Sequence, residues 1–166
     1  MATNKRFLNN NTPIDEVIAM IPKLYAPFAY SELALEIFLE AKHAGSSLSR
    51  VNKEAINLVV SQANNASLSI RAHCALLNLY GLGEDQISAI LMNRTLDDPK
   101  LDALVKLTKS VATLNGHVSE NLVERFIRSG FTNGDLIDLI IAIGLESINN
   151  YLLTVKIEPD ALATLS

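Results

Sequence analysis

Apolar residues in this chain recur at three- and four-residue intervals, the spacing of one face of an α-helix. The pattern is clear between residues 50 and 63, where Val51, Ala55 and Val59 share one face and Glu54 and Ser61 lie on another. No segment alternates apolar and polar residues over any length, as a half-buried strand would. The pattern therefore predicts an all-α protein, a compact bundle of about seven to eight helices.

Capping residues set the expected boundaries of these helices. Thr12-Pro13 is typical of a helix start, whereas Pro22 indicates a helix end near Met20. Thr132 followed three residues later by Asp135 has the spacing of a capping box. We expect helices over residues 12–20, 30–44, 50–63, 67–80, 84–93, 98–114, 119–129 and 132–155.

The last of these helices is apolar on nearly every side, which predicts a central, buried helix. Its longest apolar run, residues 136–145, is interrupted by Asp138 and is shorter than the ~20 residues that span a bilayer. We therefore expect no membrane segment.

Only 19% of the residues are charged, against 49% hydrophobic. The excess apolar surface favours a subunit interface, so we expect a homo-oligomer.

The length of 166 residues suits one principal domain. A soft boundary near residues 25–28 divides it into an N-terminal arm and helical appendage, 1–29, and a helical domain, 30–166. The net charge is −4 and lysine and arginine form no cluster, so no nucleic-acid partner is expected. The first residues are polar and resemble no signal segment, which predicts a cytoplasmic location.

The cysteine and histidine content limits the possible chemistry. One cysteine, Cys74, allows neither an intramolecular disulfide nor a cysteine-built zinc site. No two of the three histidines have the spacing of metal ligands, so neither a metal nor another cofactor is expected.

The residues from 54 to 73 hold the candidate site. Ala66, Ser69 and His73 are spaced i, i+3 and i+7, which places them on one face near the start of the fourth expected helix. Glu54, judged by its neighbours alone, belongs to a polar stripe typical of a solvated face. Ser69, with its neighbour Ser67, is explained most simply as a hydroxyl of the helix N-terminus.

Eleven residues separate Glu54 from Ala66, two separate Ala66 from Ser69, and three separate Ser69 from His73. This spacing resembles that of the alkylhydroperoxidase-D-like branch of the carboxymuconolactone decarboxylase family. That branch carries cysteines where this chain has Ala66 and Ser69. The resemblance extends from about residue 33 to residue 160. It implies the helical bundle of that family and assembly as a trimer or as a hexamer made from trimers.

The resemblance also assigns roles. In the peroxidases of the family the second cysteine attacks a hydroperoxide, the first resolves the sulfenic acid as a disulfide, and the glutamate and histidine relay protons. Glu54 and His73 occupy the relay positions, and Ala66 and Ser69 the positions of the lost cysteines. A serine hydroxyl is not ionised by surroundings that activate a thiol, and an alanine has nothing to ionise. We therefore expect no thiol peroxidase activity.

Several functions stay open. The first hypothesis is a degenerate redox site in a protein that binds a partner or a small molecule, with His73 a core histidine bonded to Glu54. The alternative is a cofactor-free decarboxylase or lyase that uses Glu54 and His73 as acid–base groups. Cys74 is either a lone redox thiol or a small buried hydrophobe. Tyr151, next to Asn150, either reaches the same pocket or packs elsewhere.

Overall fold

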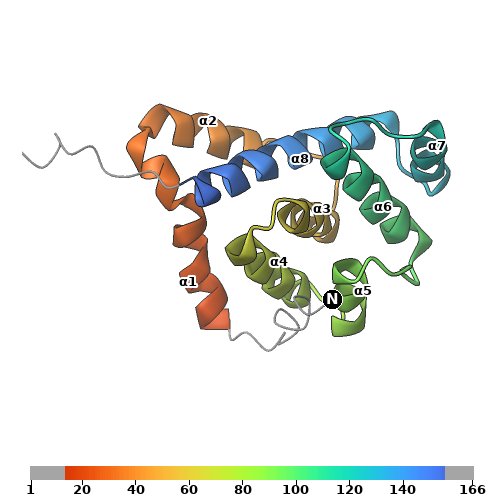
Figure 1. Cartoon of the computed structure of the whole chain (residues 1–166), viewed down its shortest axis with the longest axis horizontal. Helices are drawn as coiled ribbons and strands as arrows, with labels where there is room; N and C mark the ends of the chain where they lie inside the picture. Colours follow the sequence, from red (N-terminus) through yellow and green to blue (C-terminus); the bar gives the residue numbers. More distant parts are fainter. Residues whose placement is uncertain (1–13, 156–166) are drawn as a thin grey trace, which may run out of the picture.

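The structure is a computed structural model that describes residues 14–155 (Figure 1). These residues form eight α-helices and one short 3-10 helix, with no strand among them. The α-helices are α1 (Ile14–Tyr25), α2 (Glu32–His43), α3 (Arg50–Ala63), α4 (Ser67–Leu79), α5 (Glu84–Leu91), α6 (Pro99–Thr113), α7 (Glu120–Arg128) and α8 (Asn133–Thr154). The 3-10 helix η2 (Ala26–Tyr30) joins α1 to α2. The predicted all-α bundle is confirmed.

Helix α3 forms the centre of the molecule. Figure 1 shows it nearly end-on, with α8 running across one side of it and α4 and α5 on the other. It packs chiefly against α4, α6 and α8. Because neighbours surround it, Ala55, Ile56, Leu58 and Val60 are fully buried.

Capping residues define several helix starts. The Ser49 hydroxyl accepts a hydrogen bond from the backbone N–H of Asn52 at 3.1 Å. The Asp98 carboxylate does the same for Lys100 at 2.8 Å. Thr132 and Asp135 form the reciprocal capping box that starts α8. Side-chain oxygens thus satisfy N–H groups that have no partner inside the helix.

The expected end of the first helix was wrong. Helix α1 continues to Tyr25 and contains Pro22, although proline removes one helical hydrogen bond. Met20 and Leu24 are buried against Ala72 of α4. Burial of these side chains offsets the missing hydrogen bond. The predicted start at Thr12-Pro13, the arm before it and residues 156–166 lie outside the described residues.

The buried faces of α2 and α4 do not follow their apolar residues alone. Phe38 is the buried residue of α2, whereas Leu33 and Ile37 are exposed. In α4 the buried positions include Ser69, His73 and Cys74, while Leu79 at the end is exposed. The cause is that α4 lies between α1 and α3 and buries two faces, which a single apolar stripe does not indicate.

Helix α8 is not the central buried helix that its composition predicts. Most of its exposed apolar residues form one stripe with its C-cap Val155, at four- and three-residue spacing around Gly144, and each is between 47% and 61% exposed: Ile137, Ile141, Ile148, Tyr151 and Val155. One chain supplies neighbours to only one side of this 22-residue helix. By length and composition alone α8 would also suit a bilayer, a test that core helices of soluble proteins pass as well.

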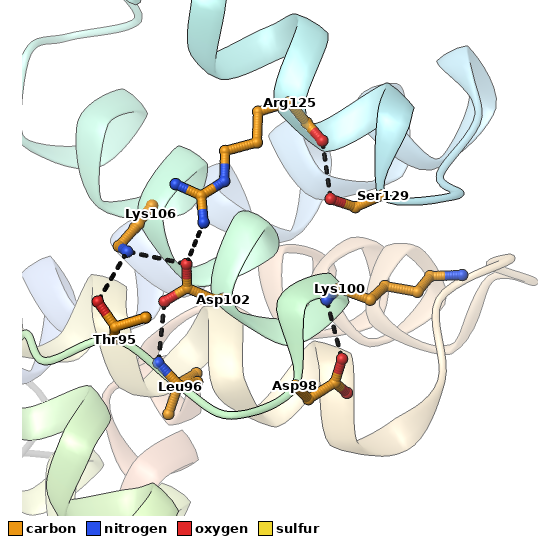
Figure 2. A network of polar contacts seen from close by, with 8 residues as sticks. All are labelled: Thr95, Leu96, Asp98, Lys100, Asp102, Lys106, Arg125 and Ser129. Atoms are coloured by element: carbon orange, nitrogen blue, oxygen red, sulfur yellow. Dashed lines mark hydrogen bonds and ion pairs between the residues drawn. The ribbon is translucent and has the colours of Figure 1, made fainter.

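A buried carboxylate fastens α6 to its surroundings (Figure 2). Asp102, 1% exposed, accepts hydrogen bonds from the backbone N–H of Leu96 at 3.0 Å and from Lys106 Nζ at 2.8 Å. Arg125 of α7 donates to the same carboxylate at 2.5 Å. Asp102 therefore joins α6, α7 and the loop before α6.

Candidate functional site: a buried histidine between two glutamates

A tight elbow between α3 and α4 positions the site. Asn65 has a left-handed backbone, φ 55°, which asparagine adopts more readily than most residues. The N–H of Ala66 bonds to Ser61 O at 2.9 Å and that of Asn65 to Gln62 O at 3.1 Å, the pattern of a Schellman motif. This turn folds α4 back along α3 and brings His73 beside Glu54.

The imidazole of His73 lies between two carboxylates. Its Nδ1 is 2.6 Å from Glu54 Oε2, and its Nε2 is 3.1 Å from Glu146 Oε1. His73 is 3% exposed, Glu146 1% and Glu54 17%. The predicted approach of Glu54 and His73 is therefore present, and α8 contributes a second carboxylate from the opposite side.

Further residues of α3 and α8, and one residue of α2, extend this polar cluster. The Ser61 hydroxyl of α3 donates to Glu146 Oε1 at 3.1 Å, and Asn150 Nδ2 of α8 donates to Ser61 Oγ at 3.3 Å. Lys42 Nζ of α2 lies 3.6 Å from Glu146 Oε2. The cluster thus links α2, α3, α4 and α8 through Glu146.

The charges of the cluster depend on one another. Burial alone lowers the pKa of His73, but Glu146 and Glu54 outweigh it and raise that pKa to about 9. Burial alone would raise the pKa of Glu146, yet His73 and then Lys42 hold it below its usual range. Burial alone lowers the pKa of Lys42, but Glu146, Tyr25 and Glu54 together outweigh it and raise that pKa. Near pH 7 the site therefore holds an imidazolium between two carboxylates, and a neutral general base is absent.

Ala66 and Ser69, where the resemblance places cysteines, lie at the start of α4. Ala66 is the N-cap of α4 and gives no side-chain hydrogen bond, so the N-cap is not Ser67. Ser69 is fully buried, and its hydroxyl has no hydrogen-bond partner. Cys74 is also buried, and burial raises the pKa of its thiol to about 12. A thiol with that pKa holds almost no thiolate at neutral pH, which makes it a poor nucleophile.

Of the two remaining candidates from the sequence, one joins the cluster and the other does not. Asn150 joins the cluster, but Tyr151 is 57% exposed on the outer stripe of α8. Sequence reasoning missed Glu146 and Lys42. The position of Glu146 inside a long apolar helix was a usable signal. A carboxylate that is buried there rarely lacks a charged partner, so the position indicates a buried ion pair. Nothing in the local sequence of Lys42 distinguished it from a surface lysine.

A cavity adjoins the cluster on the side of Lys42. It has a volume of about 110 Å³ and lies between α2, α3 and α8. Lys42 and Glu146 line it, together with Lys53, Asn57 and an apolar wall formed by Ile141, Ala142 and Leu145. Glu54, Ser69 and His73 are not among its lining residues. A molecule in the cavity would therefore meet Glu146, and His73 only through it.

The described residues offer no evident metal centre. No group of three or more histidine, cysteine, aspartate or glutamate side chains in that part of the chain could hold a metal ion. The two ring nitrogens of His73 face different carboxylates, so the three groups do not converge on a common point.

The family model described as the carboxymuconolactone decarboxylase family matches residues 31–110. This match confirms the resemblance found in the sequence over those residues. The matched segment includes Glu54, Ala66, Ser69 and His73, whereas Glu146 lies beyond it. No curated protein matches the chain.

Proposed function

We propose that this protein is a member of the carboxymuconolactone decarboxylase family whose redox site is degenerate, and that it binds a small molecule. The relay residues persist as a buried ion cluster, and the cavity beside Glu146 receives the ligand. The observation that carries this proposal is His73, 3% exposed and bonded at both nitrogens to carboxylates. Such a histidine is held as a cation and has no free nitrogen for a substrate.

The lack of usable sulfur supports the same proposal. A peroxidatic cycle needs a reactive thiolate and a second thiol that resolves the sulfenic acid. Ala66 and Ser69 provide neither, and Cys74 is buried with a raised pKa. The helices that hold the site nevertheless keep the turn and the Glu54–His73 contact. The frame thus remains while its redox chemistry is gone.

A peroxide-consumption assay with a regenerating dithiol and a disulfide-carrying adaptor tests this proposal. We expect the protein to consume an organic hydroperoxide no faster than buffer does. The variant Ala66→Cys/Ser69→Cys in a Cys74→Ala background should form a disulfide on oxidation, which shows that the frame is preserved. Turnover by the unmodified protein that disappears in Cys74→Ala would overturn the proposal and identify Cys74 as the working thiol.

A second candidate, a cofactor-free decarboxylase or lyase, has one observation in its favour. Glu146 and Lys42 border the cavity, and Glu146 also contacts His73, so a proton could pass between a bound substrate and the cluster. The test is decarboxylation of a carboxylated lactone, followed by gas evolution. Activity that is lost in both Glu54→Gln and His73→Gln, with the fold retained, would favour this enzyme over the binding protein.

We also propose that the chain assembles with copies of itself, as a trimer or a hexamer. The support is the exposed stripe of α8, with Leu33 and Ile37 of α2 as further exposed apolar residues. The four- and three-residue spacing of that stripe is the one that packs helices side by side. Exposed apolar patches larger than ~300–600 Å² are unusual on monomers and mark interaction surfaces.

A further inference from the structure

The two oxygens of the Glu146 carboxylate have different surroundings. Oε1 receives a hydrogen bond from Ser61 and faces His73 Nε2. Oε2 is buried and has no hydrogen-bond partner. Its nearest charged neighbour is Lys42 Nζ at 3.6 Å, an ion pair that is too long for a hydrogen bond. One buried carboxylate oxygen therefore retains an unused capacity to accept hydrogen bonds.

The contacts of the two oxygens place Oε2 on the cavity side of Glu146. Oε1 is directed at Ser61 and His73, neither of which lines the cavity, whereas the partner of Oε2 is Lys42, which does. A buried acceptor left without a hydrogen bond is unfavourable, and more so when it is charged. A ligand that donates a hydrogen bond there satisfies that acceptor.

The charge balance selects the kind of donor. Four charged side chains line the cavity, Lys42 and Lys53 against Asp138 and Glu146, so its lining has no net charge. An ammonium would add an unbalanced cation next to Lys42, and a carboxylate would face Glu146. A hydroxyl is neutral, and it both donates and accepts hydrogen bonds. It can therefore donate to Glu146 Oε2 and accept from Lys42 Nζ at the same time.

The opposite wall and the volume limit the rest of the ligand. Ile141, Ala142 and Leu145 give the cavity an apolar side. Its volume of about 110 Å³ is somewhat below the ~150 Å³ of an engineered cavity that binds benzene. The body of the ligand is thus a compact hydrocarbon of roughly one small ring.

From these contacts we propose that the cavity between α2, α3 and α8 binds a small uncharged alcohol, with its hydroxyl on Glu146 and Lys42 and its hydrocarbon body on the α8 wall. The inference rests on the proposed small-molecule-binding function and specifies the class of ligand. A water molecule has the same hydrogen-bonding groups and is the natural competitor, which the alcohol displaces.

A matched series of ring compounds tests this inference on the intact protein. Cyclopentanol is the probe; cyclopentanone keeps its size but cannot donate, and cyclopentylammonium donates but carries a charge. Binding is followed by methyl-resolved NMR of Ala41, Ala44 and Ile141, which line the cavity. We expect cyclopentanol to bind about ten-fold more tightly than either analogue, the value of one hydrogen bond to a charged group.

Two variants of α8 locate the binding site. Ala142→Leu fills the cavity wall and should weaken cyclopentanol binding at least about ten-fold by removing the space for the ring. Gly144→Ala adds a methyl group on the same helix where nothing lies within 4 Å, and it should leave binding unchanged within about two-fold. Circular dichroism and thermal unfolding confirm that both variants are folded.

The possible outcomes distinguish a failure of alcohol binding from a failure of the proposed small-molecule-binding function. If cyclopentanone binds as tightly as cyclopentanol and Ala142→Leu abolishes binding of both, the hydroxyl specificity is overturned. The cavity then remains a small-molecule site. Equal weakening of cyclopentanol binding in both variants would place the ring outside the cavity and overturn the inference. No methyl shift with any of the three probes would overturn the inference together with the proposed binding function.

Discussion

His73 makes stability depend on pH. Its pKa in the folded protein is about 9, against about 6.5 in an unfolded chain. Because the pKa is higher in the folded protein, protonated His73 stabilises the fold. This stabilisation is fully present below pH 6.5 and is lost as the pH rises through 9. The size of the shift corresponds to about 3 kcal/mol over that window. Urea unfolding at pH 6.5, 7.5 and 8.5, at fixed protein concentration, measures it.

The matched control for that series is His73→Gln. Glutamine does not titrate in this range, so the variant should be less stable at pH 6.5 and should show a much flatter pH dependence. Cys74 is retained in both proteins and its effect cancels. An equally steep loss of stability in His73→Gln would show that another group is responsible.

The burial of Glu146 and Lys42 predicts which of the two contributes more to the free energy of unfolding. Glu146 is 1% exposed and Lys42 is 25% exposed, although the two form one ion pair. Glu146→Leu leaves the imidazolium with one carboxylate and should lower the free energy of unfolding by about 3–5 kcal/mol. Lys42→Met keeps the aliphatic stem and should cost about 1 kcal/mol or less, because water reaches the ammonium. Equal losses measured by urea unfolding would contradict this ranking.

At the scale of the helices, Asp102 is the main polar link between α6 and α7 (Figure 2). Asp102→Asn keeps the shape but removes the charge that Lys106 and Arg125 share, and it should cost about 2–3 kcal/mol. The control is Glu124→Gln, which breaks the exposed pair with Arg128 and should cost less than about 0.5 kcal/mol. Thermal unfolding distinguishes the two, and indistinguishable values would remove the special role of Asp102.

The exposed stripe of α8 belongs to the scale of the whole molecule. We expect light scattering at micromolar concentration to give the mass of three or six chains. Ile137→Glu places a charge on the stripe away from the cavity and should dissociate the assembly. Glu120→Gln, on exposed α7, should leave the mass unchanged. A stable species with the mass of one chain for the unmodified protein would show that the stripe has another role.

Much of the fold follows from local signals in the sequence. Helix starts at Ser49, Asp98 and Thr132 were predictable because a capping side chain bonds to backbone only two or three residues away. The extent of α3 followed from apolar spacing and from the polar residues behind it. Pro22 misled the prediction, because contacts of α1 with a helix distant in the sequence compensate for the lost hydrogen bond.

Half of the site was also predictable. The family resemblance carried by the spacing of Glu54 and His73 predicted their contact, and the structure places His73 Nδ1 2.6 Å from Glu54 Oε2. Glu146 comes from 73 residues further along the chain than His73, and no periodicity or motif connects the two.

The sequence by itself therefore determined most of the helices and their capping residues, because these depend on residue type and on short separations along the chain, and the family resemblance predicted the Glu54–His73 contact. Only the tertiary structure decided that the polar stripe of α3 is buried, since α8 packs over Asn57 and Ser61. It also decided that His73 is a cation between two carboxylates, and that α8 exposes an apolar stripe. These properties depend on which distant helices meet, because burial and electrostatic interaction are set by distance in space.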